Sequence, residues 1–477
     1  MFEFSSIEHY HARLKEGRAT CVQAVEYYLQ QIDACSHLNA FIEIYSNESL
    51  ERAAFLDQKR KNGQVTGKLH GVIIGLKDVI CYKDHRISAS SGILQDFISV
   101  YSATVVEKLL AEDAILIGRL NCDEFAMGSS NENSYYGNVL NAADETRIPG
   151  GSSGGSAVAV QAGLAMITLG SDTGGSVRQP ADFCGIVGLK PTYGRVSRHG
   201  LIAYASSFDQ IGIFGNNIPD VSRVLEVIAG ADDFDSTVSQ KPVEVYSKKH
   251  DQHKKYRFAF FREALDHPAI DPEITEAING LIEKIKADGH VAEAVKFDYL
   301  DYIVPAYYVL TTAEASSNLS RFDGVKYGYR TKSEAANLED FYAQTRSEGF
   351  GKEVKRRIML GTFVLSTGYF DAYFTKAQQV RMLLKEKTHQ VFEDYDFIIL
   401  PTSPSTAFKI GEKSNDPIAM YLADIYTVMS NLVGIPAISL PLFKHSNQMP
   451  FGLQIMANNF HELSLLQASD LLMHKYA

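Results

Sequence analysis

The sequence has no run of apolar residues long enough to cross a membrane, since no stretch approaches about 18 consecutive apolar positions. Its first residues, Met-Phe-Glu-Phe-Ser-Ser-Ile-Glu-His, have neither the basic start nor the apolar stretch of a signal peptide. Cysteine is scarce: five occur in 477 residues, and none forms a Cys-x-x-Cys pair. This argues against a disulfide framework and a zinc knuckle. The absences together predict a cytosolic protein with no metal site and no membrane contact.

Basic residues are fewer than acidic residues. The chain holds 46 Lys and Arg against 57 Asp and Glu, which gives a net charge of −11. A protein that binds nucleic acid by itself needs a clustered basic surface, because phosphate contacts supply most of the affinity. The local basic stretch at 248–255 is typical of a solvated loop. If nucleic acid takes part in the function, we expect another subunit to hold it.

What is present is the pattern of an α/β protein. Short β-branched runs alternate with stretches of helical spacing, and this alternation predicts a sheet covered by helices. Residues 1–65 are expected to form an N-terminal helical segment, because apolar residues recur there at helical spacing. Strands are expected at 72–76, 114–118, 166–169, 256–261, 397–400 and 437–440. Further helices are expected at 104–110, 157–162, 271–289 and 370–392.

The domain organisation is expected to be simple. No internal repeat or low-complexity linker divides the chain, so we predict a single domain over residues 1–477. The polar region near 232–255 is the best candidate for a boundary or an insertion.

Two glycine-rich clusters are the most informative feature of the chain. The first runs Arg-Ile-Pro-Gly-Gly-Ser-Ser-Gly-Gly-Ser-Ala from Arg147, and the second runs Gly-Ser-Asp-Thr-Gly-Gly-Ser-Val-Arg from Gly170. Glycine loses much conformational entropy on folding, so such clusters need a reason. The usual reason is a backbone that approaches a ligand closely and directs its N–H groups at an anion. Serines within those turns could then serve as nucleophile and proton relay, which indicates acyl transfer.

Several familiar motifs fit these clusters only in part. Gly151 to Gly155 satisfies the Gly-x-Ser-x-Gly pattern around Ser153, but the polar residues before it do not form the strand that this motif requires. Asp172-Thr173-Gly174 matches an aspartic-protease loop without a second copy. A phosphate loop would need a lysine before its closing serine. A purely structural role for the glycines, or catalysis by a histidine such as His70, His85 or His199, also remains open.

Lys77 offers a different base. It follows an apolar run, where burial would disfavour the charged ammonium and lower its pKa. A neutral lysine can take a proton from one serine hydroxyl, which can in turn deprotonate another. Lys77 is followed directly by Asp78, however, and a lysine beside an aspartate at a strand end is commonly a structural ion pair.

The motifs together resemble the amidase signature family. The resemblance rests on the run from Gly150 to Ser156, the run from Gly170 to Arg178, and the segment Cys184-Gly185 to Thr192. The spacing agrees as well, since Ser152 lies 75 residues after Lys77 and 24 residues before Ser176. The resemblance covers essentially the whole chain and implies a large mixed β-sheet surrounded by helices.

The resemblance also implies roles for individual residues. Ser176 corresponds to the nucleophile, Ser152 to the relay serine and Lys77 to the base. The backbone N–H groups of Thr173, Gly174, Gly175 and Ser176 would form the oxyanion hole. The family pattern further implies a cis peptide before Ser152.

Three further segments narrow the resemblance to the glutaminase subunits of tRNA-dependent amidotransferases within this family. They are Asp123 to Glu132, Tyr193 to Arg198, and Glu314 to Gly324. The substrate would then be glutamine, with Arg357 as a bidentate clamp for its carboxylate and Asp424, on the amphipathic stretch 417–432, facing its ammonium. Arg356 is the alternative to Arg357, and the two should point about 100° apart on a helix. Met127, Ser129 and Tyr307 are the other expected substrate-binding residues.

The expected function is therefore to hydrolyse glutamine to glutamate and ammonia, and to supply the ammonia to a partner. The resemblance implies a tRNA-binding subunit, which holds ATP and Mg²⁺ and converts Glu-tRNA(Gln) to Gln-tRNA(Gln), and a small third subunit; no cofactor is expected in this chain. Two alternatives stay open. One is a stand-alone amidase for small amides, active without a partner. The other is a non-catalytic scaffold subunit, against which the presence of Lys77, Ser152 and Ser176 argues.

Overall fold

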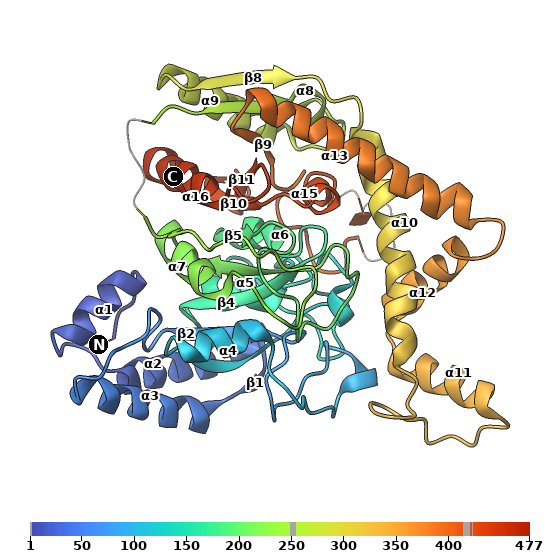
Figure 1. Ribbon diagram of the computed structural model, residues 1–477, viewed down its shortest axis with the longest axis horizontal. Helices are drawn as coiled ribbons and strands as arrows, with labels where there is room; N and C mark the ends of the chain where they lie inside the picture. The colour runs from blue at the N-terminus through green and yellow to red at the C-terminus, as the bar shows by residue number, and fades with distance from the viewer. Residues whose placement is uncertain (1, 249–253, 414–419, 422) are drawn as a thin grey trace.

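A mixed β-sheet of eleven strands runs through the molecule (Figure 1). The computed structural model describes residues 2–248, 254–413, 420–421 and 423–477. The strand order is β1-β3-β2-β4-β6-β5-β10-β11-β9-β7-β8. The strands are β1 (Phe41–Ile44), β2 (Ile73–Lys77), β3 (Ile115–Leu120), β4 (Ile167–Asp172), β5 (Val187–Lys190), β6 (Gln210–Gly215), β7 (Arg257–Phe261), β8 (Val291–Val295), β9 (Phe397–Pro401), β10 (Ala437–Lys444) and β11 (Pro450–Ala457).

Helices surround this sheet. The longer ones are α1 (Ile7–Lys15), α2 (Cys21–Ala34), α3 (Ser46–Lys61), α4 (Thr104–Ala111), α5 (Gly154–Gln161), α6 (Arg178–Cys184), α7 (Ile218–Ile228), α9 (Pro272–Ala287), α10 (Leu300–Asn318), α11 (Leu338–Gly349), α12 (Lys352–Val364), α13 (Lys376–Asp394), α15 (Val428–Val433) and α16 (Glu462–Tyr476). The short turns are α8 (Arg262–Leu265), η1 (Ser36–Leu38), η2 (Gly92–Leu94), η3 (Glu124–Ala126), η4 (Leu319–Arg321) and the π-helical η5 (Asp371–Thr375). The α/β fold with a large mixed sheet, expected from the sequence, is confirmed.

The centre of the sheet is parallel. β2 pairs in parallel with both β3 and β4, with Leu76 opposite Leu169 in the β2–β4 ladder. All residues of these three strands are buried, which explains why their sequences are nearly continuous apolar runs rather than alternating ones. α5 packs against β2 and β4. The small residues of α5 permit that close approach, and Ala157, Val158 and Ala159 are fully buried by it.

The N-terminal segment differs from its expectation in one respect. Helices form as predicted, namely α1, α2 and α3, but β1 lies between α2 and α3 and pairs antiparallel with β3. Its residues are only partly buried, so its pattern is weak. The helices are anchored to the body of the protein: Ile7 donates its backbone N–H to Asp220 of α7 at 2.9 Å. The division of the chain into domains stays a prediction, and the basic stretch at 248–255 lies largely outside the described residues.

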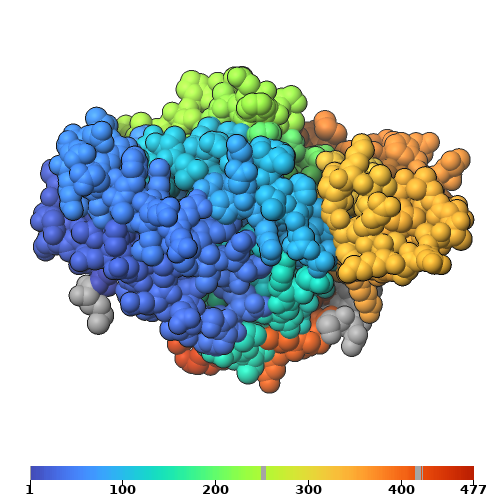
Figure 2. Space-filling view, turned by 90° about the horizontal axis from the view of Figure 1, so that it is seen from below, coloured from blue at the N-terminus to red at the C-terminus, as the bar shows by residue number. Residues whose placement is uncertain are grey.

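The other predicted segments agree with the structure to within a few residues, except that the helix expected at 370–392 begins as η5 before it continues as α13. The sequence analysis did not predict β5, β6, β8 and β11. α10, α12 and α11 lie along the side of the molecule away from α1 (Figure 1). The view from below shows the same separation, with the N-terminal part of the chain in blue and the amber part, which contains α11, at opposite ends (Figure 2).

Candidate active site

The parallel pairing of β2 and β4 brings Lys77 and the second glycine cluster to one edge of the sheet. β2 ends at Lys77, and β4 ends at Asp172, just before Thr173 to Ser176. The first cluster lies at the same place, because Ser152 and Ser153 immediately precede α5 and this helix packs on both strands. Ligand sites of α/β proteins form at the carboxyl ends of such strands.

Lys77 is the centre of a buried cluster of hydroxyl groups. Its Nζ donates to Ser152 Oγ at 2.7 Å, to Ser153 Oγ at 2.9 Å and to Ser171 Oγ at 2.9 Å. Lys77, Ser152 and Ser153 are completely inaccessible to solvent. The Gly151–Ser152 peptide is cis, as the family resemblance implies. The structure thus joins the expected base and relay serine by a direct hydrogen bond.

The electrostatics favour an uncharged Lys77. Burial lowers its pKa from the ordinary value near 10.5 to about 8, although Asp123, Asp172 and Asp209 oppose the shift. Asp78 does not neutralise it. The Asp78 carboxylate instead binds Arg119 Nη1 at 2.5 Å and accepts the backbone N–H groups of Ser88 and Ser90 at 3.0 and 2.7 Å. The structural ion pair between Lys77 and its neighbour, which the sequence left open, is therefore absent.

Asp172 organises the loop that carries Ser176. Its carboxylate accepts the backbone N–H groups of Gly175 at 2.8 Å and Val177 at 3.2 Å, the two residues that flank Ser176. Arg178 donates to the same carboxylate through Nε at 3.0 Å and Nη2 at 2.9 Å. Burial alone would raise the pKa of Asp172, but Arg178 outweighs it and holds that pKa well below its ordinary value. The two clusters also meet directly, because Ser153 donates its N–H to the carbonyl of Ser176 at 3.3 Å.

Two positions of the loop require glycine for steric reasons. A Cβ at Gly174 would lie 2.3 Å from the hydroxyl of Tyr307, and one at Gly175 would lie 2.2 Å from Thr427 Oγ1. Gly175 also has a φ of +127°, which disfavours any other residue. The predicted substrate-binding residue Tyr307, on α10, therefore packs directly on the loop of Ser176.

One of the backbone donors expected in the oxyanion hole already has an acceptor in the structure. The N–H of Gly175 is engaged by the Asp172 carboxylate, so in this geometry it is not directed at the space beside Ser176. The spacing of residues could not reveal this competing acceptor. The N–H groups of Thr173, Gly174, Gly175 and Ser176 stay predicted donors. The side chain of Thr173 is fixed as well, since its hydroxyl donates to Asp209 at 2.7 Å.

Arg357 points into the protein and Arg356 does not. The Arg357 guanidinium is buried, with Nε 2.9 Å from Glu353 Oε1 and Nη1 2.9 Å from the hydroxyl of Tyr204. The rings of Tyr204, Tyr308 and Tyr421 lie 5.5 to 6.0 Å from it. Arg356 is partly exposed and pairs with the other oxygen of Glu353. Burial alone would lower the pKa of Arg357, but the surrounding tyrosines and Glu353 keep it raised and the group charged.

Asp424 lies in the same region. Its Oδ2 accepts hydrogen bonds from Ser129 Oγ and from the hydroxyl of Tyr308, both at 2.9 Å. Burial raises the pKa of Asp424 to about 6. Met127 is fully buried just after η3, on the segment that leads to Ser129. The amphipathic stretch predicted at 417–432 lies partly outside the described residues, but Asp424 itself is within them.

Sequence reasoning missed several residues that shape this region. Tyr308 binds Asp424, although only its neighbour Tyr307 was expected here. Asp123 is buried beneath the first cluster, where its backbone N–H donates to the carbonyl of Ser152 at 3.0 Å and its carboxylate accepts the N–H of Asn131 at 2.9 Å. Asp172 and Arg178 lie inside the second motif, so their position indicated that they belong to the site. The sequence did not indicate that the two side chains pair with each other.

The candidate histidines are engaged elsewhere. His70 Nδ1 lies 3.0 Å from Asp113, and His85 Nε2 lies 2.7 Å from Glu48. His199 stacks between the rings of Tyr101 and Phe234. The structure therefore gives no support to a serine–histidine arrangement.

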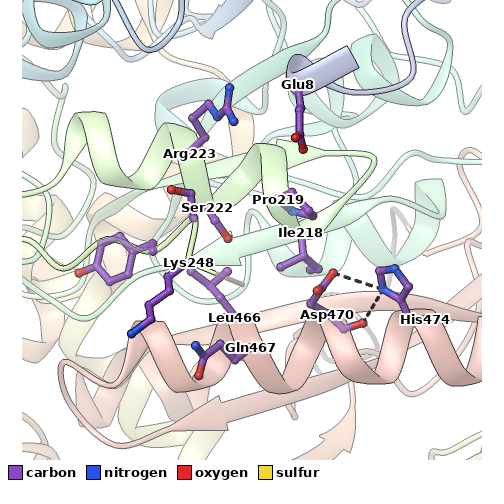
Figure 3. Close-up of a pocket in the computed structure, with 12 residues that line it drawn as sticks. Glu8, Ile218, Pro219, Ser222, Arg223, Lys248, Leu466, Gln467, Asp470 and His474 are labelled. Atoms are coloured by element: carbon purple, nitrogen blue, oxygen red, sulfur yellow. Dashed lines mark hydrogen bonds and ion pairs between the residues drawn. The ribbon is translucent and has the colours of Figure 1, made fainter. Parts of the chain in front are cut away.

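A separate hollow is lined by residues of α1, α7 and α16, among others (Figure 3). It is lined by both charge signs, including Glu8, Arg223, Lys248 and Asp470, and contains none of the expected site residues. Within the described residues, no three His, Cys, Asp or Glu side chains are grouped to hold a metal ion. No helix in that part of the chain is long and apolar enough to span a bilayer.

The comparisons with known proteins show which family this chain belongs to. The amidase family model matches residues 23–466, and the chain therefore belongs to the amidase family. The chain is 48% identical to the A subunit of the glutamyl-tRNA(Gln) amidotransferase of Chlorobium phaeobacteroides, over 99% of both chains. The crystal structure of the corresponding protein from Thermotoga maritima matches with a TM-score of 0.80 at 36% identity, over 100% of this chain and 96% of that one. The peptide amidase of Stenotrophomonas maltophilia has a TM-score of 0.81 at 27% identity, over 99% and 97% of the two chains.

Proposed function

We propose that this chain is the glutamine-hydrolysing subunit of a tRNA-dependent amidotransferase. The observation that carries the proposal is the hydrogen bond between the buried Lys77 Nζ and Ser152 Oγ, next to the loop of Ser176. The similarity to amidotransferase A subunits along the whole chain supports the choice of substrate and partners.

In the proposed reaction, Ser176 Oγ attacks the side-chain amide carbon of glutamine. Its proton passes through Ser152 to the neutral amine of Lys77. The negative charge that develops on the amide oxygen is stabilised by the N–H groups of Thr173, Gly174 and Ser176. The protonated lysine then returns a proton through Ser152 to the leaving nitrogen, and ammonia departs. Water hydrolyses the γ-glutamyl ester to glutamate and restores Ser176.

The buried charged groups in this region suit the α-substituents of glutamine. Arg357 offers a buried, always charged guanidinium for the carboxylate, and Asp424 offers a carboxylate for the ammonium. Tyr307 connects the two parts of the site, because it packs against Gly174 and its ring lies 5.0 Å from that of Tyr308. The arrangement therefore accounts for a small zwitterionic amide better than for a hydrophobic one.

The ammonia would be used by a partner subunit in the cytoplasm. That partner would bind tRNA, ATP and Mg²⁺ and convert Glu-tRNA(Gln) to Gln-tRNA(Gln), with a small third subunit completing a heterotrimer. This chain would hold no cofactor of its own. The net charge of −11 suits such a division, because it leaves the tRNA to the partner.

The decisive experiment uses the assembled complex and the Ser176→Ala variant. We expect this variant to abolish amide transfer from glutamine while transfer from added ammonium chloride stays within about twofold of the wild type. Loss of both reactions would contradict the proposed role. A stand-alone amidase would instead hydrolyse small amides at the same rate with and without the partner subunits, tRNA and ATP.

A further inference from the structure

The hydroxyl group of Thr427 is directed away from its own helix and toward the loop of Ser176. Thr427 directly precedes α15 and is fully buried. A threonine at the start of a helix usually accepts a hydrogen bond from an N–H of that helix, but the Thr427 side chain makes no such bond. Its Oγ1 instead donates to the carbonyl oxygen of Gly174 at 2.7 Å. Capping of α15 therefore does not account for this hydroxyl.

The bond to Gly174 is the shorter of two that this hydroxyl can make. The carbonyl oxygen of Asp424 lies 3.1 Å from the same Oγ1, but a hydroxyl has only one hydrogen to donate. The Asp424 carbonyl does not depend on it, because it also accepts the backbone N–H groups of Thr427 at 3.1 Å and Val428 at 3.2 Å. The Gly174 carbonyl is therefore the main acceptor of the Thr427 hydroxyl.

The peptide group that joins Gly174 to Gly175 is held at both of its polar ends. Thr427 binds its carbonyl oxygen, and the Asp172 carboxylate accepts its N–H at 2.8 Å. Two successive glycines form a backbone that rotates easily, because neither has a Cβ to restrict it. Any change in their backbone angles moves the N–H groups of Gly174 and Ser176, which are expected to bind the oxyanion. The two bonds therefore fix a part of the loop that its own sequence leaves free.

Thr427 also fills the space beside the loop. A Cβ at Gly175 would lie 2.2 Å from Thr427 Oγ1 and 2.6 Å from Thr427 Cβ, so the two residues are in direct contact. Tyr307 approaches the neighbouring position in the same way, since a Cβ at Gly174 would lie 2.3 Å from its hydroxyl. The side chain at position 427 must therefore be small as well as able to donate a hydrogen bond.

The groups that hold Asp172 also hold Thr427 in place. Arg178 Nη1 donates to the carbonyl oxygen of Thr427 at 2.7 Å, and its Nη2 donates to Asn431 Oδ1 at 2.7 Å. Asn431 Nδ2 in turn donates to Asp172 Oδ1 at 2.9 Å. The side chains of Asp172, Arg178, Thr427 and Asn431 are all buried. The Thr427 hydroxyl is therefore presented to the loop from a fixed position.

We propose that Thr427 is a positioning residue for the hydrolysis of glutamine: its hydroxyl holds the Gly174–Gly175 peptide so that the loop presents its N–H groups to the developing oxyanion. This inference rests on the proposed function, because the oxyanion is taken to form from the side-chain amide of glutamine. Thr427 does not itself touch the reacting atoms. Since the oxyanion exists only after Ser176 has attacked, loss of the hydroxyl should lower kcat and leave KM nearly unchanged.

The test measures glutaminase kinetics of the assembled complex with variants at position 427. Thr427→Val keeps the shape of the side chain but removes the donor, so kcat should fall about 10- to 100-fold while KM for glutamine stays within about threefold of the wild type. Thr427→Ser keeps the donor and loses only a methyl group, so its kcat should stay within about threefold. Thr427→Ala differs from Thr427→Ser only by the missing oxygen and should behave as Thr427→Val does, which keeps the comparison valid if valine disturbs the packing.

Thr388→Val is the matched control. The Thr388 hydroxyl is also buried and donates to a backbone carbonyl oxygen, that of Leu384, at 2.7 Å, but it lies within α13 and has no bond to the loop of Ser176. We expect its kcat and KM to equal those of the wild type. Equal melting temperatures of the wild type and the variants establish that all of them are folded.

A second measurement probes the charged tetrahedral state directly. The probe is a glutamine analogue in which a boronic acid replaces the side-chain amide. Ser176 Oγ adds to the boron atom, its proton passes through Ser152 to Lys77, and a tetrahedral boronate anion results. The inhibition constant of this analogue should rise in Thr427→Val by about the factor by which kcat falls, because both depend on the same donors.

Three results would overturn the inference while leaving the proposed function intact. They are a wild-type kcat in both Thr427→Val and Thr427→Ala, a kcat that falls equally in Thr427→Ser, and a rise in KM with unchanged kcat, which would assign Thr427 to substrate binding. A wild-type complex that does not hydrolyse glutamine would overturn the proposed function, and the inference with it.

Discussion

Lys77 and Asp78 are neighbours in the chain, but their side chains belong to separate hydrogen-bond networks. The Lys77 amine contacts the hydroxyl groups of Ser152, Ser153 and Ser171, whereas Asp78 binds Arg119. They separate because successive residues at a strand end point to opposite faces of the sheet. Because of this separation, no carboxylate pairs with the buried Lys77 amine. An unpaired, buried amine loses its proton more easily, and a lysine must be neutral in order to act as a base near neutral pH.

The pH dependence of glutamine hydrolysis should therefore report on Lys77. The reactive form is the neutral amine, whose fraction rises with pH up to the pKa near 8. We expect kcat/KM to increase about tenfold per pH unit between pH 6 and 7 and to level off above pH 8.5. Lys77→Met should lower kcat by about 10²- to 10⁴-fold without unfolding the protein. A rate that is independent of pH over this range would argue for a different base.

Asp172 should matter for stability as well as for activity. Asp172→Asn leaves the fully buried Arg178 without its counter-charge, which typically costs about 3–5 kcal/mol. The control is Asp144→Asn, because the pair of Asp144 with Arg147 is partly exposed to solvent and should contribute no more than about 1 kcal/mol. Urea unfolding of both variants gives the comparison. Equal stabilities would mean that the buried pair does not hold the loop of Ser176.

Arg357 and Arg356 provide a matched test of substrate binding. Arg357→Lys keeps the charge but loses the planar pair of donors, so KM for glutamine should rise about 10- to 100-fold. Arg356→Lys should stay within about twofold, because that side chain is partly exposed and already paired with Glu353. Steady-state kinetics with glutamine measure both values. The reverse order would assign the carboxylate to Arg356.

Asp424 should give KM an acid limb. Its carboxylate is charged above its pKa of about 6 and neutral below it, so the ammonium group of glutamine loses its partner as the pH falls. We expect KM to rise about tenfold from pH 7 to pH 5. Ser129→Ala removes a hydrogen bond to the charged form and should move this limb to higher pH. An unchanged limb in that variant would show that another group titrates.

Gly174 should tolerate no side chain. In Gly174→Ala the added Cβ would lie 2.3 Å from the hydroxyl of Tyr307, so the loop or α10 must shift. A displaced oxyanion donor should cost about 100-fold or more in kcat. Gly280→Ala is the control, since a Cβ there has open space and lies on helix α9, where alanine is favoured. Wild-type kinetics in Gly174→Ala would show that the loop does not supply a donor that the reaction needs.

The sequence was most informative where one local pattern decides the structure. The apolar runs that end at Lys77 and Asp172 predicted β2 and β4, because only a buried strand accommodates them. The motifs around Ser152 and Ser176 predicted the composition of the site. β1 was missed because its residues are only partly buried and sit between helices.

The partners of each site residue could not be predicted, because they depend on chain segments far apart in the sequence. Asp172 is bonded to Asn431 across 259 residues, and Ser129 to Asp424 across 295. The engagement of the Gly175 N–H is local, but it depends on the side-chain rotamer of Asp172, which no spacing rule gives. Tyr307 and Tyr308 are neighbours on α10, and only the direction in which each points from the helix decides that Tyr308 binds Asp424.

The parallel ladder between β2 and β4 has a consequence for how this chemistry can arise. The amine and the hydroxyl groups it contacts come from strands that are joined only through β3, α5 and the loops between them, so no short stretch of the chain contains both. A peptide spanning only the glycine-rich region would be inert. The reactive cluster therefore exists only in chains in which β2 and β4 are paired, so recovery of turnover after denaturation reports on that pairing.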